Sequence, residues 1–163
     1  MPKTQLKKVS IQIRDQLKNL DLSYEKIYFE PGRYLVGDAA LFLSKVVSAD
    51  KNNWIFLDIG NHICPRFARC SLRFYNASRI QSPHKYKKSI AGIIPTDQDV
   101  LAKDYFMTKK IKRGDIFLIT NVGAYTLTFS NRFPYRLPYI FIVNGEEMNT
   151  IFDPTKDKDF SLS

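Results

Sequence analysis

The sequence predicts a mainly β protein, an antiparallel β-barrel or sandwich, that follows one N-terminal helix and one short strand. Three observations support this fold class. Short apolar and β-branched runs recur after Val36, turn signals such as Arg113-Gly114-Asp115 separate them, and helical periodicity occurs only near the start. Many short strands with few helices are typical of a closed or sandwiched antiparallel sheet. A length of 163 residues suits one domain with an appendage.

The first 35 residues are predicted to form a separate unit. Apolar residues at helical spacing predict an amphipathic helix, namely Leu6, Val9, Ile13, Leu17 and Leu20. The run 26–29 is a strand candidate, and Glu30-Pro31-Gly32-Arg33 ends it, because proline fixes φ and glycine permits a sharp change of direction. One helix and one strand cannot cover both faces of a parallel sheet, so residues 1–35 are expected to be the end of something larger.

The β region is predicted to span residues 36–152, followed by a polar tail at 153–163. The run 41–48 and the run 54–58 are expected to pair as a hairpin around the turn at 51–53. Residues 100–105 are expected to form a helical turn or an irregular loop. Further strands are expected at 71–76, 88–94, 115–120, 124–129 and 139–143.

Composition excludes several classes of protein. The chain is 44% hydrophobic and 25% charged, as in ordinary globular proteins, which argues against a disordered chain. No run of 18 apolar residues occurs, so no membrane-spanning helix is expected, and the charged start does not resemble a signal peptide. Only two cysteines occur, so no disulfide framework is expected and a reducing cytoplasm is the expected compartment.

The charge of the chain favours an anionic partner. The net charge is +9, and no acidic residue lies between Asp58 and Asp97. Such a segment can also be a solvated basic face without a ligand. A basic β-barrel that binds nucleic acid is an alternative, because aromatics lie among the basic residues, but their spacing lacks the alternation of a stacking strand and this alternative ranks below the others. His62, Cys64 and Cys70 are too few for a four-ligand zinc site, and we expect no metal.

Five motifs, in order, resemble one enzyme family. These are the Glu30-Pro-Gly-Arg33-Tyr-Leu-Val run, the strand end Phe56-Leu-Asp58-Ile-Gly60-Asn61, the segment 91–104, the pair Arg113-Gly-Asp115 and Gly123-Ala124-Tyr125, and the run from Asn131 to Pro138. Together they resemble the alanine-racemase-fold, pyridoxal phosphate (PLP)-dependent amino-acid decarboxylases. The diaminopimelate, ornithine and arginine decarboxylases are members, and the diaminopimelate branch is the most similar.

The resemblance implies an incomplete enzyme. Members combine a (β/α)₈ barrel, whose lysine carries PLP, with a C-terminal β domain that completes the site, often across a dimer interface. This sequence resembles the last helix and strand of that barrel followed by the β domain. No Tyr-x-x-Lys-x-Asn segment occurs within the 163 residues. We therefore expect the C-terminal portion of a carboxy-lyase. It is expected to be inactive alone, to have no catalytic residue of its own, and to bind PLP only with a complementary barrel.

Three residues are implied to contact the cofactor. Glu30 corresponds to the carboxylate that faces the pyridine nitrogen and favours its protonated form. Arg33 is implied to bind the PLP phosphate or the substrate carboxylate through its guanidinium fork. Tyr125 is implied to donate its hydroxyl to the phosphate. From residue type alone, these would be a surface glutamate, a surface ion pair and a packing tyrosine.

Three further residues are implied to contact an amino-acid substrate. Asp99, the better match, and Asp97 are implied to bind the distal amino group of a diamino acid. Arg66 is implied to bind a distal carboxylate, although the order Pro65-Arg66 reverses the family's Arg-Pro. Pro95 stands where the family has a cysteine thought to handle a proton. A proline side chain cannot do so.

The alternative is a truncated binding or dimerisation domain without chemistry. In either case we expect a homodimer or a complex with a separate barrel polypeptide. Several leucine-sized side chains on the N-terminal helix would be costly to leave in water, at about 1.5–3 kcal/mol each. The helix, or the sheet face that bears Tyr125, is therefore the expected contact surface.

Overall fold

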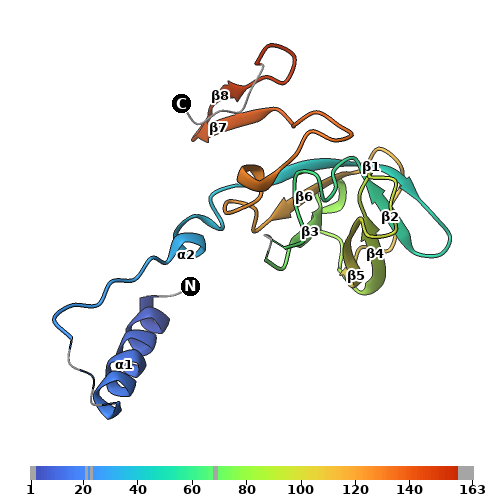
Figure 1. The fold of residues 1–163 in the computed structure, drawn as a ribbon. Helices are drawn as coiled ribbons and strands as arrows, with labels where there is room; N and C mark the ends of the chain where they lie inside the picture. Colours follow the sequence, from blue (N-terminus) through green and yellow to red (C-terminus); the bar gives the residue numbers. More distant parts are fainter. Residues whose placement is uncertain (1–2, 21, 23, 68–69, 158–163) are drawn as a thin grey trace. The chain divides into compact units, whose positions relative to one another are not determined.

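A computed structural model describes residues 3–20, 22, 24–67 and 70–157 (Figure 1). The chain divides into two compact units, Met1–Leu35 and Val36–Ser163. In the first unit, helix α1 spans Lys3–Asn19, where the spacing of apolar residues predicted a helix. Its exposed apolar residues include Leu6, Val9 and Ile11, and Leu20 directly after the helix is exposed too.

The predicted strand at 26–29 is wrong, because residues 26–31 form no regular structure. A strand exists through hydrogen bonds to a partner strand, and no such ladder involves these residues in the described part of the chain. The short helix α2 follows at Gly32–Val36. Its first turn begins directly after Pro31, whose carbonyl accepts a hydrogen bond from the Tyr34 amide at 2.7 Å.

The second unit is mainly β, as predicted. Its six-stranded sheet has the order β3-β6-β1-β2-β4-β5. The Tyr105 hydroxyl of β5 accepts a hydrogen bond from the Phe74 amide of β3 at 3.2 Å, so the two edge strands approach each other and the sheet is nearly closed (Figure 1). The strand bounds are β1 Phe42–Ala49, β2 Trp54–Leu57, β3 Arg73–Asn76, β4 Tyr86–Ala91, β5 Val100–Met107 and β6 Ile116–Thr120.

Strand pairing is antiparallel with one exception. The predicted hairpin of β1 and β2 is confirmed, whereas β2 and β4 pair in parallel. The parallel pair places the ends of β2 and β4 at the same edge of the sheet. Consequently the loops that follow these strands, at 58–64 and 92–99, leave the barrel side by side.

The core fills the barrel interior. Phe74 and Phe117 are its largest fully buried side chains, and Ile55, Leu57 and Ile119 pack with them. Inward and outward residues alternate along β6, which is the pattern of a sheet with one buried face.

Two predicted elements are wrong. Val100–Met107 is strand β5, not a helical turn or loop. Residues 124–129 are not a strand, because the segment turns and forms the 3₁₀ helix η2, Leu127–Phe129. Another 3₁₀ helix, η1, spans Ala77–Arg79.

The last part of the chain forms a second, two-stranded sheet. Strands β7, Ile140–Asn144, and β8, Glu147–Phe152, pair antiparallel around the predicted Asn144-Gly145 turn. Strand β8 was not predicted. The tail is described only as far as Asp157, and the remainder of the predicted 153–163 tail lies outside the described residues. No helix in the described part of the chain is long and apolar enough to cross a membrane.

Candidate functional site

The loop after β6 presents Tyr125. The side chain is 46% exposed, and the backbone has φ of 62° at this residue and 72° at Asn121. Positive φ is rare for residues with a side chain, and for a bulky ring it stores about 1–3 kcal/mol of strain. Such strain persists only where surrounding contacts impose it, and it is concentrated at functional sites.

Those contacts come from the start of the second unit. The Gly123 amide donates to the Gly37 carbonyl at 2.9 Å, and a Cβ on Gly123 would collide with the Val36 carbonyl oxygen. The Thr126 hydroxyl also donates to the Val122 carbonyl. The glycine thus allows the backbone at 36–37 to lie against this loop and to fix the direction of Tyr125.

An exposed aromatic cluster extends from Tyr125. Its ring lies 6.2 Å from that of Phe129, which meets the ring of Phe67 edge-on at 5.5 Å between centroids. Arg66 is exposed and directly precedes Phe67. The structure therefore brings the segment of Arg66 to the surface that bears Tyr125. Sequence analysis missed Phe67 and Phe129, because nothing in the sequence indicates that these rings meet.

Asp99 has a different environment. Only 1% of the residue is exposed, and its carboxylate accepts the Asn61 amide at 2.7 Å and the Ile94 amide at 2.8 Å. A Cβ on Gly60 or Gly92 would collide with this carboxylate. Two glycines therefore let the loops after β2 and β4 close around Asp99. This geometry makes Asp99 a connector of two loops, with each carboxylate oxygen already accepting one backbone amide.

Asp97 lies two residues earlier and is exposed. Its Oδ1 accepts the Thr96 hydroxyl at 3.3 Å. The same loop borders a mainly apolar groove of about 430 Å³, whose lining includes Phe56, Pro95, Thr96 and Asp99 but not Asp97. An exposed carboxylate such as that of Asp97 can reach a solvent-borne ammonium group, whereas Asp99 lines the groove and already accepts two backbone amides.

His62 lies next to this loop pair. It is 4% exposed, and its ring lies 5.7 Å from that of Tyr135. Burial lowers the pKa of His62 below its usual value of 6.5, while the negative charge of Asp99 opposes this shift. The buried Nδ1 has no hydrogen-bond partner among the described residues. Nor do three potential metal ligands gather anywhere in the described part of the chain.

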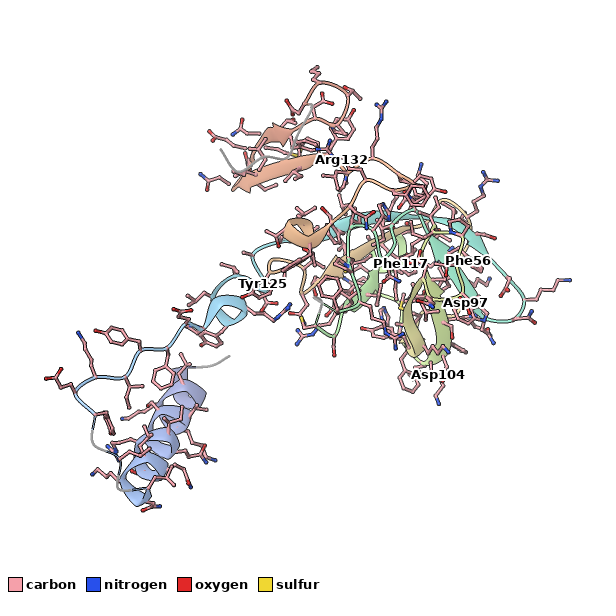
Figure 2. All side chains as sticks on the ribbon, viewed as in Figure 1. Phe56, Asp97, Asp104, Phe117, Tyr125 and Arg132 are labelled. Carbon is pink, nitrogen blue, oxygen red and sulfur yellow. The ribbon has the colours of Figure 1, made fainter. Side chains whose placement is uncertain are left out.

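The expected site residues occupy three places. Figure 2 shows Tyr125 and Asp97 at separate positions on the second unit, on the loops after β6 and β4. Glu30 and Arg33 belong to the first unit, Glu30 exposed just before α2 and Arg33 half-buried within it. The second unit therefore connects the segment of Arg66 to Tyr125 through the rings of Phe67 and Phe129, whereas Tyr125 and Asp97 lie apart.

The Tyr125 loop carries one hydroxyl that could contact a phosphate oxygen. Its ring is held at one side by Phe129 and its hydroxyl can donate to a phosphate oxygen. Gly123, where a side chain cannot be accommodated, keeps the loop backbone close to residues 36–37. A tyrosine held in a strained conformation suits a ligand contact better than simple packing.

The chain is similar to known proteins in sequence and to solved structures in fold. Diaminopimelate decarboxylase from Bacillus subtilis (strain 168) is 28% identical over 150 residues, which are 86% of this chain and 34% of that protein. Lysine/ornithine decarboxylase from Selenomonas ruminantium is 29% identical over 110 residues, 66% of this chain and 28% of that protein. The structure of diaminopimelate decarboxylase from M. jannaschii aligns with a TM-score of 0.67 and 26% identity, over 86% of this chain and 33% of that one.

The chain is thus similar to part of the diaminopimelate and lysine/ornithine decarboxylases. No family model matches it. It spans about a third of the length of these decarboxylases. SrLDC, a further similar structure, was solved with PLP and cadaverine and aligns with a TM-score of 0.58 and 25% identity, over 75% of this chain and 32% of that one.

Proposed function

We propose that this chain supplies the β domain of a PLP-dependent amino-acid decarboxylase and acts together with a barrel polypeptide that carries the cofactor lysine. The observation that supports this most is the strained, half-exposed Tyr125 in the Gly123-Ala124-Tyr125 loop. When bound, PLP supplies the electron sink for loss of CO₂. The chain's own residues would bind, orient and hold protons around it.

In this proposal each expected residue has one task. Tyr125 and Arg33 bind the phosphate, and the Glu30 carboxylate holds a proton on the pyridine nitrogen. Arg66 binds a substrate carboxylate beside the Tyr125 cluster, and Asp97 binds a distal ammonium group. Asp99 is left out of the substrate site because its carboxylate is buried between two backbone amides.

The separation of Tyr125 from Asp97 supports a homodimer. Within a single copy of the second unit, Tyr125 and Asp97 lie at different places (Figure 2). For Tyr125 to bind the cofactor phosphate and Asp97 the substrate at one site, the two side chains would come from two copies, or from one copy and another polypeptide. The exposed rings of Phe67, Phe129 and Tyr125 offer an apolar surface for such a contact, and aromatic residues are enriched at interfaces. The two free cysteines fit a reducing cytoplasm as the proposed compartment.

Complementation tests the proposal. The 163-residue chain would be mixed with the remaining two thirds of the Bacillus subtilis decarboxylase, including its lysine-bearing barrel, and with PLP. We expect a stable complex in sedimentation and CO₂ release from diaminopimelate, ornithine or lysine. The chain without the barrel fragment is expected to gain no specific pyridoxyl adduct on borohydride reduction and mass spectrometry.

Two controls make the outcome decisive. The barrel fragment without the chain should be inactive, and its intact parent enzyme should be active under the same conditions. A complex that forms and holds PLP without releasing CO₂ would favour the alternative of a binding domain without chemistry. A chain that takes up one pyridoxyl group on a single lysine by itself would contradict the division of tasks proposed here.

A further inference from the structure

Two exposed aromatic rings lie where the barrel nearly closes. Strands β3 and β5 approach each other there, since the Phe74 amide donates to the Tyr105 hydroxyl at 3.2 Å. The rings of Phe74 and Tyr105 meet edge-on at 5.3 Å between centroids and pack with the core. Successive residues of a strand point to opposite faces, so the residues that follow them, Tyr75 and Phe106, point outward. These two residues are 37% and 54% exposed.

The strand next to β5 adds cations to this outer surface. Lys87 of β4 pairs with Phe106 in the ladder, and paired residues of an antiparallel ladder share a face. The Lys87 Nζ lies 6.0 Å from the centroid of the Phe106 ring. Lys85, two residues earlier and directly before β4, is exposed too. Ammonium groups therefore lie beside one of the two rings.

Further basic side chains lie around Tyr75. Its ring is 6.2 Å from that of His84, which directly precedes Lys85. Arg73 is exposed and lies two residues before Tyr75 on β3, so it points to the same face as that ring. Within the described residues, Arg73, Lys85 and Lys87 form no ion pair. Their charges therefore remain available to an anion.

Two carboxylates belong to this region of the barrel. Asp115 is 4% exposed, lies 3.9 Å from Arg79 Nε and accepts the Lys112 amide at 3.2 Å, so its charge is enclosed and engaged. Asp104 of β5 is exposed (Figure 2). Its negative charge opposes the binding of a polyanion, and the three unpaired cations outweigh it.

We propose that the aromatic–basic face, formed by Arg73, Tyr75, Lys85, Lys87 and Phe106, binds single-stranded nucleic acid. Unpaired bases stack on aromatic rings while lysine and arginine bind the phosphates, and this mode of binding tolerates different base sequences. In the sequence, the aromatics do not alternate along one strand. The barrel instead brings one ring from β3 and one from β5 to the same outer surface. The proposal does not depend on the decarboxylase function.

Single-stranded nucleic acid uses both the rings and the charges of this face. An acidic protein segment or an anionic membrane would pair with the cations, but neither requires two open rings. The contact of Lys87 leaves Phe106 accessible, because a cation–π contact at an exposed site is weaker than the stacking of a base on the ring. The displaced ammonium group can then bind a phosphate of the same strand.

Fluorescence anisotropy of a labelled oligodeoxythymidine, titrated with the 163-residue chain, tests the proposal. We expect saturable binding that weakens as salt rises, and about tenfold weaker binding of a DNA duplex, whose bases are already stacked. Phe106→Ala should raise the Kd for the oligonucleotide by about fivefold or more, because one stacking surface is lost. Phe141→Ala removes an exposed ring from β7 and should leave the Kd within about twofold.

Charge variants test the phosphate contacts. Lys87→Gln should raise the Kd and reduce the slope of log Kd against log salt by about 0.7, the value for one phosphate of a single strand. Lys7→Gln, on helix α1, changes the net charge equally and should leave the slope unchanged. Asp104→Asn should lower the Kd, because it removes the opposing carboxylate.

Several outcomes would overturn the proposal. Equal losses in Phe106→Ala and Phe141→Ala, or in Lys87→Gln and Lys7→Gln, would show diffuse electrostatic attraction. Equal binding of the duplex would show the same. Competition by polyglutamate or by phosphatidylserine vesicles as strong as that by unlabelled oligonucleotide would assign the face to an acidic protein or a membrane. Phe106→Leu, which keeps an apolar side chain and loses the ring, replaces Phe106→Ala if that variant does not fold.

Discussion

The two loops that carry family motifs use their key side chains in opposite ways. In the loop after β4, Asp99 points inward, is 1% exposed, and accepts two backbone amides. In the loop after β6, Tyr125 is 46% exposed and sits at φ of 62°. In the first loop a buried carboxylate stabilises the backbone, whereas in the second loop the backbone positions an exposed side chain.

Glycines make both arrangements possible. Gly60 and Gly92 leave room for the Asp99 carboxylate, and Gly123 leaves room for the Val36 carbonyl. A motif residue can therefore belong to the architecture of a site without touching its ligand. The difference predicts that changes at Asp99 act on stability, whereas changes at Tyr125 act on ligand binding.

The largest expected effect is that of Asp99→Ala. The substitution leaves the part-buried Asn61 and Ile94 amides without their acceptor, and a fully buried group of this kind costs about 1–3 kcal/mol. We expect the free energy of unfolding, measured by urea denaturation, to fall by about 2–5 kcal/mol. Asp97→Ala is the matched control and should change it by less than about 0.5 kcal/mol. Similar losses in both variants would remove the distinction between a buried and an exposed carboxylate.

A smaller effect is expected for Tyr125→Asn. Asparagine tolerates positive φ better than tyrosine, so relief of strain offsets the loss of the half-exposed ring. The free energy of unfolding should change by less than about 1 kcal/mol. In contrast, Tyr105→Asn removes a ring that packs on Phe74 and should cost more than about 2 kcal/mol. Comparable destabilisation in the two variants would mean that Tyr125 is an ordinary packing residue.

The smallest expected effect is a pH dependence of stability from His62. Burial depresses its pKa in the folded state, so at pH values below about 6.5 the unfolded chain binds a proton that the folded chain resists. The free energy of unfolding should therefore fall as the pH decreases below about 6.5, and His62 should not affect it at higher pH. His62→Gln should remove this component of a urea-denaturation pH profile. An unchanged profile in this variant would assign the pH dependence to other groups.

Much of the barrel could be predicted from the sequence, because β1, β2, β3 and β6 alternate buried and exposed residues in β-branched and aromatic runs. Strand β5 could not, since its Ala102, Lys103 and Asp104 favour other structures and pairing with β4 decides its conformation. The segment 124–129 has the composition of a strand, but positive φ at Asn121 and Tyr125 turns the chain out of any ladder.

The candidate site, too, could be predicted from the sequence only in part. Motifs singled out Asp99 and Tyr125 equally, and only the spatial meeting of Gly60 with Gly92 reveals that Asp99 is enclosed. Likewise, the contact of Phe67 with Phe129 joins segments about 60 residues apart in the sequence, and no local pattern indicates it.

The most direct test of the proposed function is PLP retention by the complex with the barrel fragment, comparing wild type with Tyr125→Phe and, as a matched control, Tyr75→Phe in β3. Loss of the Tyr125 hydroxyl removes one hydrogen bond to a charged group, so the Kd for PLP should rise about tenfold or more, with a shifted ³¹P signal. Tyr75→Phe should leave both unchanged. Equal Kd values and ³¹P signals in all three complexes would contradict the assignment of Tyr125 to the cofactor phosphate.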